Sequence, residues 1–266
     1  MLIFEACVRL HPKKLYIQHM DKIDIKSYIA KPNSVFGDFA SKDNLDASEK
    51  KLKNALKGVR KDLSDFQERL YAHSKYNVLI CLQGMDSAGK DSLIREVFKD
   101  FNVSGVVVQS FKVPTERELK HDFLWRHYIA LPPRGKFGVF NRTHYENVLV
   151  TRVHPEYILN ENIPGIDTVE DVDEKFWDQR FRDINEFEHH LAINGTIIFK
   201  FFLHLSKEEQ RQRLLRRLDK PNKNWKFSPG DLREREEWDD YRQCYQEAIQ
   251  NTTKPHAPWY IIPSDD

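Results

Sequence analysis

Asn77-Val-Leu-Ile-Cys-Leu-Gln83 is a short, continuous apolar run, and Gly84-Met-Asp-Ser-Ala-Gly-Lys90 follows it directly. The run predicts a fully buried strand, and a helical pattern from Asp91 to Phe101 follows the loop. Gly-x-x-x-x-Gly-Lys between a strand and a helix is typical of a phosphate-binding loop, because its glycines let main-chain amides turn inward while the helix N-terminus and the lysine add positive charge. The alternative is a Gly-rich turn that contains a lysine by chance. The residues expected to bind phosphate are Gly84, Ser87, Ala88, Gly89, Lys90, Asp91 and Ser92.

Two acidic residues depart from the usual pattern of such a loop. Asp91 stands where a Ser or Thr usually supplies a hydroxyl ligand to Mg²⁺, although Ser92 comes next. Asp86 lies inside the loop, where a bare carboxylate repels phosphate. A divalent cation between carboxylate and phosphate makes this arrangement favourable, since Mg²⁺ and Mn²⁺ take oxygen ligands. We therefore expect Asp86 to bind Mg²⁺, or Mn²⁺, directly or through one water; the alternative is that Asp86 caps its own turn.

The rest of the chain alternates between strand and helix patterns. Further strands are expected at 106–112, 136–140, 196–205 and 259–263, and helices at 116–129, 171–192 and 207–218. This alternation predicts an α/β fold with a five-stranded parallel sheet and helices on both faces. We expect residues 1–75 to form an N-terminal arm and helix, and residues 76–266 to form the core.

A helix is expected from Asp46 to Ala72, with one apolar stripe along it. The stripe comprises Leu52, Leu56, Val59, Leu63, Phe66 and Leu70. It indicates a helix docked on the core, or alternatively a seam between subunits. Residues 1 to about 45 are expected to form an irregular or partly helical arm.

Composition limits the classes of partner. The 266 residues include 42 Lys and Arg and 41 Asp and Glu, a net charge of +1, whereas nucleic-acid and membrane-surface binders usually carry a clear positive excess. Cys7, Cys81 and Cys244 are odd in number and far apart, which favours a reducing compartment over a disulfide framework or a zinc site. No apolar run approaches the ~18 residues of a membrane span, and charge interrupts the N-terminus too early for a signal peptide. We expect a cytoplasmic protein with no nucleic-acid or membrane partner.

Cationic residues follow the strands at the edge where parallel sheets bind their ligands. Lys112 follows the second strand, Arg142 follows the third, and Arg126 and Arg152 lie in the segments around them. With Lys90, these cations exceed what one nucleotide tail requires. They favour a longer anion as the ligand.

A second basic cluster lies on the helix that Ser206-Lys-Glu-Glu209 opens as a capping box. Arg213, Arg216, Arg217 and Lys220 share one face of this helix. The face is either solvated and paired with the acidic stretch 234–240, or part of a lid that closes over phosphates. We expect a helical lid at about 207–230.

The ordered blocks together resemble the polyphosphate kinase 2 family, from about residue 30 to the C-terminus. The matching stretches are 84–90, Ser110-Phe-Lys112, His121-Asp-Phe-Leu-Trp-Arg126, Phe140-Asn-Arg-Thr-His-Tyr-Glu146, Val150-Thr-Arg-Val-His-Pro155, Arg216-Arg-Leu-Asp-Lys-Pro221, Trp225-Lys-Phe227 and 258–265. The resemblance implies a P-loop kinase-like three-layer α/β/α fold. It also implies reversible, Mg²⁺-dependent transfer of a phosphoryl group between inorganic polyphosphate and a purine nucleoside di- or monophosphate.

The resemblance also implies roles for individual residues. Asp86 and Lys90 match catalytic residues of the family loop. Arg142, also expected to be catalytic, resembles a phosphate contact of the family, as do Lys112, Arg126 and Arg152, and the family's lid matches 214–227 with Arg217 and Lys220. Asn141 stands where some members carry Asp, so Glu146 or Asp122 is expected to supply the missing negative charge to the metal. Family members are often homo-oligomers, so a dimer or tetramer is expected.

Other functions remain open at this stage. An ATP-dependent kinase of a nucleoside monophosphate or small metabolite would share the fold and differ in its phosphate donor. A non-catalytic nucleotide- or polyphosphate-binding protein would have no need to keep both Asp86 and Lys90. A phosphohistidine intermediate at His144 or His154 is a further alternative, although nothing in the spacing activates either ring. A GTPase is disfavoured, because the chain contains no Asn-Lys-x-Asp motif.

Overall fold

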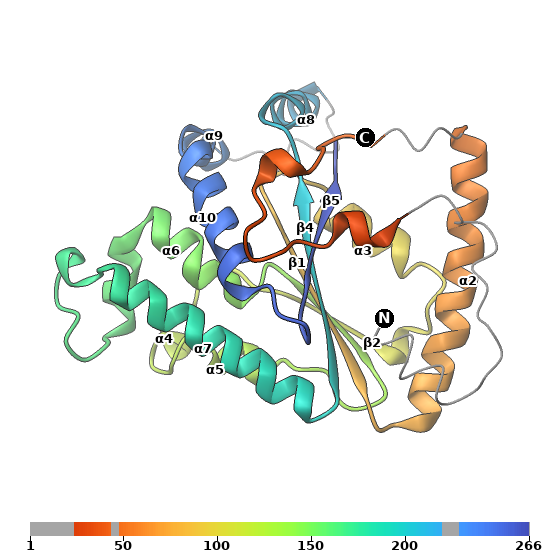
Figure 1. The fold of residues 1–266 in the computed structure, drawn as a ribbon, viewed down its shortest axis with the longest axis horizontal. Coiled ribbons are helices and arrows are strands. Elements are labelled where there is room, and N and C mark those ends of the chain that lie inside the picture. Colours follow the sequence, from red (N-terminus) through yellow and green to blue (C-terminus); the bar gives the residue numbers. More distant parts are fainter. Residues whose placement is uncertain (1–23, 44–47, 220–228, 266) are drawn as a thin grey trace.

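The computed structural model describes residues 24–43, 48–219 and 229–265, which build a sheet between two layers of helices (Figure 1). The strands run in the order β2-β3-β1-β4-β5 and all pair in parallel. This confirms the predicted five-stranded parallel sheet. The strands are β1 (Asn77–Gly84), β2 (Val106–Ser110), β3 (Phe137–Asn141), β4 (Thr196–His204) and β5 (Trp259–Pro263).

Side chains of the central strand alternate between the two helical layers, as its continuous apolar sequence requires. Val78 packs in one cluster with α2 (Glu49–His73) and with Phe98 and Phe101, which follow α3 (Lys90–Val97). Leu79 and Cys81 pack on the opposite face with α7 (Glu174–Ile193). Because all five strands are parallel, their carboxyl ends meet at one edge of the sheet, between the two helical layers.

The shorter elements connect this framework. The remaining α-helices are α4 (Glu116–Leu119), α5 (Trp125–Tyr128), α6 (Val150–Val153), α8 (Lys207–Asp219), α9 (Pro229–Glu236) and α10 (Trp238–Thr252). The 3₁₀ helices are η1 (Ile25–Tyr28), η2 (Phe36–Asp38), η3 (Val103–Gly105), η4 (His144–Val148), η5 (Pro155–Glu161) and η6 (Val169–Asp171).

Helix α2 is docked on the core through its C-terminal half alone. Ser48 caps its first turn, and Leu63, Phe66 and Leu70 pack on the sheet. Leu52 in the N-terminal half remains 39% exposed. The predicted apolar stripe therefore lies on one continuous helix. Its C-terminal half packs on the sheet, and its N-terminal half is exposed.

One predicted helix is wrong, and one helix was not predicted. The segment 116–129 forms two single turns, α4 and α5, because the Asp122 carboxylate accepts from the main-chain amide of Leu124 and bends the chain between them. Helix α10 was not predicted; the start of this segment entered the sequence analysis only as part of the acidic stretch 234–240. Trp238, Tyr241 and Tyr245 recur on its buried face at helical spacing, a signal that identifies the helix.

The described part of the N-terminal arm, residues 24–43, runs along the β5 side of the sheet. Ile29 bridges Tyr260 of β5, and the Phe36 ring stacks on Phe202 with centroids 5.0 Å apart. The arm is therefore irregular with short 3₁₀ turns, as predicted, and it closes the sheet edge that β5 leaves open.

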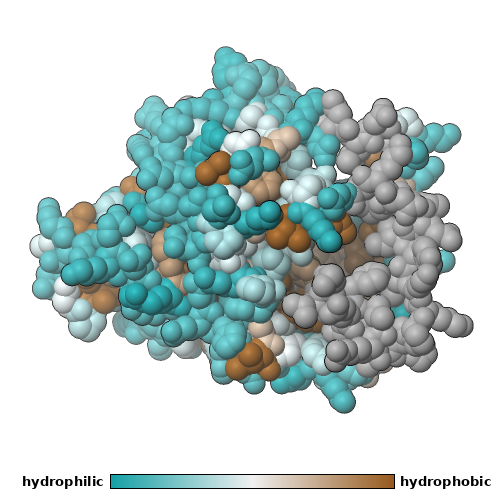
Figure 2. All heavy atoms as spheres, viewed as in Figure 1, coloured by the Kyte–Doolittle hydropathy of each residue, from teal (hydrophilic) through white to brown (hydrophobic). Residues whose placement is uncertain are grey.

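The surface seen in Figure 2 is hydrophilic over most of the described residues, with small separate apolar patches. Within residues 24–43, 48–219 and 229–265, no helix combines the length and the apolar character needed to cross a bilayer.

Candidate active site

The loop between β1 and α3 has the backbone of a phosphate cradle. A Cβ at Gly84 would lie 3.0 Å from the carbonyl oxygen of Leu203, so glycine is needed where the loop passes β4. Gly89 has φ +102° and Ser87 has φ +66°, both in the left-handed region. These turns tighten the loop immediately before helix α3, which presents its N-terminal amides there.

Lys90 is held by the loop itself. Its Nζ donates to the carbonyl oxygens of Gly84, at 2.6 Å, and Met85, at 3.3 Å. Burial and the nearby Arg142 charge lower the pKa of Lys90 to about 8, although Asp86, Glu146 and Asp91 act in the opposite direction. An added phosphate would favour the charged form, so anion binding and protonation of Lys90 are coupled.

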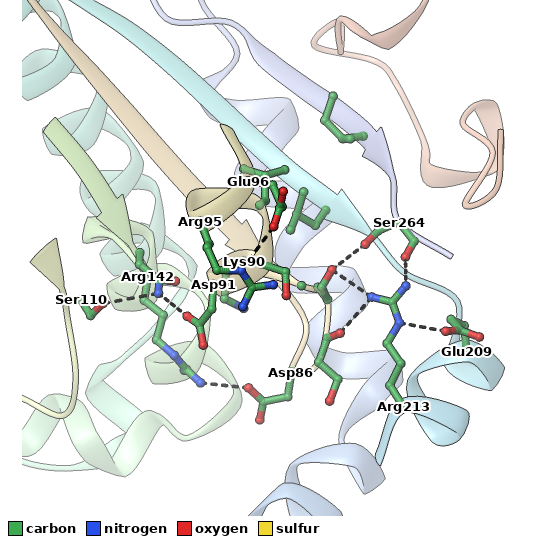
Figure 3. A pocket seen from close by; sticks show the side chains of 18 of the residues that line it. Asp86, Lys90, Asp91, Arg95, Glu96, Ser110, Arg142, Glu209, Arg213 and Ser264 are labelled. Carbon is green, nitrogen blue, oxygen red and sulfur yellow. Dashed lines mark hydrogen bonds and ion pairs between the residues drawn. The ribbon is translucent and has the colours of Figure 1, made fainter. Parts of the chain in front are cut away.

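Asp86 and Arg142 meet across the mouth of the loop (Figure 3). The Arg142 Nη2 lies 2.9 Å from Asp86 Oδ1, and its Nη1 lies 3.4 Å from Glu146 Oε2. The two carboxylates raise the pKa of Arg142, which stays charged at every working pH. Arg142 has φ +57°, a strained conformation for a non-glycine residue, directly after β3. Residues 56 positions apart in sequence are thus brought together as predicted.

Asn141 at the end of β3 holds Asp91 at the start of α3. Its Nδ2 donates to Asp91 Oδ1 at 2.9 Å and to Ser110 Oγ at 3.4 Å. The carboxylate nearest to Asn141 is therefore that of Asp91. Glu146, one of the two residues expected to supply negative charge to the metal, is paired with Arg142 at 3.4 Å.

Three side chains that sequence reasoning did not assign to the loop fix its carbonyl groups. Arg213 Nη1 donates to the carbonyl oxygens of Ser87 and Ala88, at 3.1 and 3.2 Å, and Ser264 Oγ donates to that of Ala88 at 2.6 Å. Gln210 Nε2 donates to the Asp86 carbonyl oxygen at 3.1 Å. These bonds hold the loop backbone in place from two neighbouring segments, α8 and the residue after β5. Ser264 was identifiable, because it directly follows a strand at the ligand-binding edge.

A cleft of about 1150 Å³ opens over the loop between α3, β2 and α8 (Figure 3). Seven cationic and five acidic side chains line it, so its walls alone carry a net charge of +2 in a chain whose total net charge is +1. The cations are Lys90, Arg95, Lys112, Arg142, Arg213, Arg216 and Arg217, and the acids are Asp86, Asp91, Glu96, Glu209 and Asp265. Ser92 lines it as well, and Arg95 was not predicted.

Part of the basic face on α8 is neutralised within the helix. Arg213 Nε lies 2.9 Å from Glu209, and the Arg216 guanidinium pairs with the same carboxylate. The predicted lid at 207–230 begins as helix α8, and its central part, 220–228 with Lys220, lies outside the described residues.

Arg126 and Asp122 lie beside a second, much smaller hollow. The buried Arg126 donates to the carbonyl oxygen of Lys112 at 2.8 Å, and its guanidinium lies over the Phe111 ring. Arg126 therefore touches the cleft through the main chain of Lys112, while its own side chain faces the hollow.

The structure does not bring three other candidates into the cleft. Arg152 lies 2.5 Å from Glu247 and over the Trp177 ring. His144 is fully buried and lies 3.1 Å from Glu188, and His154 lies 3.3 Å from Glu234. None of the three lines the cleft among the residues that the structure describes.

The carboxylates suit a metal that is held mainly by its substrate. Within the described ranges no three His, Cys, Asp or Glu side chains gather as a ready metal cage. Asp86 and Asp91 nevertheless both line the cleft over the phosphate loop. Mg²⁺ typically takes one or two carboxylates together with substrate phosphates and water. The residues present fit that mode of binding.

Comparisons with known proteins agree with this geometry. Residues 46–266 match the family model for polyphosphate kinase 2 (PPK2). The chain is 43% identical over 259 residues to the ADP-polyphosphate phosphotransferase of Rhodopseudomonas palustris, covering 97% of this chain and 85% of that one. It is also 43% identical over 253 residues to the AMP/ADP-polyphosphate phosphotransferase of Meiothermus ruber, covering 95% and 86%. The crystal structure of polyphosphate kinase 2 from Arthrobacter aurescens superposes with a TM-score of 0.75 at 34% identity, covering 92% and 80%.

Proposed function

Because the chain belongs to the polyphosphate kinase 2 family, we propose that its cleft transfers a phosphoryl group, reversibly, between inorganic polyphosphate and a purine nucleoside di- or monophosphate. The observation that carries the proposal is the acidic phosphate loop, in which Asp86 lies 2.9 Å from Arg142 at the mouth of a cation-lined cleft. One nucleotide tail does not need seven cationic side chains, whereas a polyphosphate chain uses them.

The chemistry is in-line displacement at phosphorus. An anionic oxygen of the nucleotide's terminal phosphate forms a bond to the last phosphorus of polyphosphate, while the bridging P–O bond to the rest of the chain breaks and leaves its electrons on that chain. No proton needs to move, because the attacking oxygen is already anionic near neutral pH and the leaving oxygen is stable as an anion at the new end of the polyphosphate chain. Catalysis then consists of positioning and charge neutralisation, which Lys90 and Arg142 supply.

Asp86, with Asp91 on the same wall, is the proposed holder of Mg²⁺ or Mn²⁺. A cation held there would neutralise part of the phosphate charge during transfer. Arg142 orients Asp86 through their ion pair, and Asn141 orients Asp91 through its amide. This assignment explains an acid inside an anion cradle.

Polyphosphate and a purine nucleotide are the proposed partners. Lys112, Arg217 and the loop residues 84–92 are the proposed phosphate contacts in the cleft. The lid at about 207–230, the homo-oligomer and the cytoplasmic location stay predictions, which limited proteolysis with and without substrate, light scattering and cell fractionation test.

The decisive experiment is a donor and acceptor screen. The protein is incubated with Mg²⁺ and AMP, ADP, GMP or GDP, with either polyphosphate or ATP as donor, and the nucleotides are separated and quantified. We expect phosphorylated nucleotide with polyphosphate. Products formed with ATP and absent with polyphosphate would identify an ATP-dependent nucleotide kinase instead.

A further inference from the structure

Helix α2 reaches past the sheet on the side of the cleft. Its 25 residues span about 37 Å, whereas the eight residues of the following strand β1 span roughly 26 Å. The two run in opposite directions, so the N-terminal half of α2 extends beyond the carboxyl edge of the sheet, where the phosphate loop lies (Figure 1). This half has little packing of its own, since Leu52 and Leu56 are exposed there.

Positive charge is concentrated in that projecting half. Residues 49–61 contain six Lys or Arg and one acid, whereas residues 62–73 contain three acids and one Arg. Lys50, Lys53, Lys57 and Arg60 follow at intervals of three, four and three, so they form one stripe along the helix. The three lysines are exposed. Lys53 pairs with Glu49 at 2.5 Å, but both side chains are more than 70% exposed, which makes the pair weak.

The C-terminal end of the stripe lies at the wall of the cleft. Its last member, Arg60, is buried and donates to Glu96 of α3 at 2.6 Å. Glu96 and its neighbour Arg95 both line the cleft. Lys99, exposed at the end of α3, acts electrostatically on Glu96 and adds a cation between the two helices. Cationic side chains therefore continue from the cleft over α3 and along α2.

We propose that this lysine stripe of α2 is a second binding surface for polyphosphate, which holds the part of a long chain that extends beyond the cleft; the inference rests on the proposed function. Each added phosphate carries negative charge out of the cleft, and the stripe is the basic surface that touches the cleft wall at Arg60. A second copy of the chain placed on the same stripe would bring like charges together. A polyanion neutralises them and gains long-range attraction.

The test compares chain lengths. The variant Lys53→Ala/Lys57→Ala removes two stripe charges and keeps helix propensity, because alanine is the best helix former. The matched control, Lys51→Ala/Lys175→Ala, removes one exposed lysine from another face of α2 and one from α7. The kcat/KM is measured at low salt with tripolyphosphate and with long-chain polyphosphate, and binding of the long chain is measured directly by calorimetry.

We expect the stripe variant to lower kcat/KM and affinity for the long chain by about tenfold, with tripolyphosphate turnover unchanged and both substrates unchanged in the control. Added salt should abolish the difference. Equal losses on both chain lengths, no loss, or a changed oligomeric state by light scattering would overturn the proposal; the last outcome would assign this face to a second copy. If the wild type does not turn over polyphosphate, the proposed function fails, and the calorimetric comparison still decides the stripe.

Discussion

Two clusters of charged side chains lie on either side of the segment that follows β3, and they use their hydrogen bonds differently. Beneath it, the fully buried Lys200 donates to Glu188 at 2.6 Å, the Tyr145 hydroxyl at 2.8 Å and the Thr252 carbonyl oxygen at 2.8 Å. These three bonds use all three N–H groups of the ammonium. Above it, Lys90 donates to main-chain carbonyls of its own loop, and Arg142 is 43% exposed.

The difference separates charges that hold the fold from charges that we propose bind a ligand. The buried network joins α7, β4, α10 and Tyr145, which lies three residues after Arg142, so it fixes the base of the segment that carries Arg142. The cationic groups at the cleft keep N–H donors within reach of an anion. Removing a buried partner should therefore cost stability, and removing a cleft partner should cost rate.

The largest expected effect is at Asp86. Asp86→Ala should lower the rate of nucleotide phosphorylation by at least about 10²-fold at saturating Mg²⁺, because it removes the carboxylate proposed to hold the metal. The melting temperature should stay near that of the wild type, since this side chain is partly exposed and packs on no core cluster. Initial rates and a thermal melt check both. Near wild-type turnover of Asp86→Ala would end the metal assignment and remove the contrast between the two clusters.

Lys200→Met should act in the opposite way. It leaves Glu188 buried without its cationic partner, which costs about 3–5 kcal/mol of the free energy of unfolding. In a chain of this size the melting temperature should fall by roughly 10 °C. The double variant Lys200→Met/Glu188→Leu should recover part of the loss, because no unpaired charge remains. An unchanged melt of the single variant would show that the buried network contributes little to stability.

Arg213 combines both kinds of role, because it lines the cleft and also holds the loop. Arg213→Lys keeps the charge and loses the planar fork that contacts the Ser87 and Ala88 carbonyls. We expect kcat to fall by about tenfold, an order-of-magnitude figure for a displaced preorganised donor set. Arg211→Lys is the control, since Arg211 is exposed and pairs with Glu208 outside the cleft. Equal rates for the two variants would argue against positioning by Arg213.

The comparison also shows which parts of the fold and the candidate site can be predicted from the sequence. The strand, the loop and Lys90 were predictable because local patterns encode them within fourteen residues, 77–90. Asp86 stood out as a carboxylate inside an anion-binding loop, and strand ends placed Arg142 at the right edge. The contacts of Asn141 with Asp91 and of Arg213 with Ser264 join segments 50 and 51 residues apart. Such pairings depend on sheet order and helix packing, which a periodic pattern does not specify.

Lys200 uses all three of its N–H groups inside the protein, whereas the charge of Lys90 should respond to pH and to a bound anion. With a pKa of about 8 in the free protein, Lys90 loses its charge as the pH rises through 8. Because polyphosphate favours the charged form, kcat/KM should decline severalfold between pH 8 and 9, and binding at pH 8 should take up about half a proton. Calorimetry in buffers of different ionisation enthalpy measures this uptake, and Lys90→Arg should abolish it. Since the unfolded chain has the higher pKa, the contribution of Lys90 to stability rises with pH over the same range. Uptake that persists in Lys90→Arg would assign the proton to another group.

The smallest effect on activity is expected at Arg152, which sequence position suggested as a phosphate contact. Its guanidinium is already paired with Glu247, lies over Trp177 and faces away from the cleft, so it resembles the saturated network more than the open cluster. Arg152→Gln should leave kcat and the KM for polyphosphate within about twofold, while the melting temperature falls by a few degrees because Glu247 loses a half-buried partner. Arg142→Gln provides the comparison, with a large loss of rate and a small change in melting temperature. A KM raised about tenfold in Arg152→Gln would mean that the Arg152 side chain leaves Glu247 to bind substrate. An ion pair within the protein would then no longer distinguish residues that stabilise the fold from residues that bind the ligand.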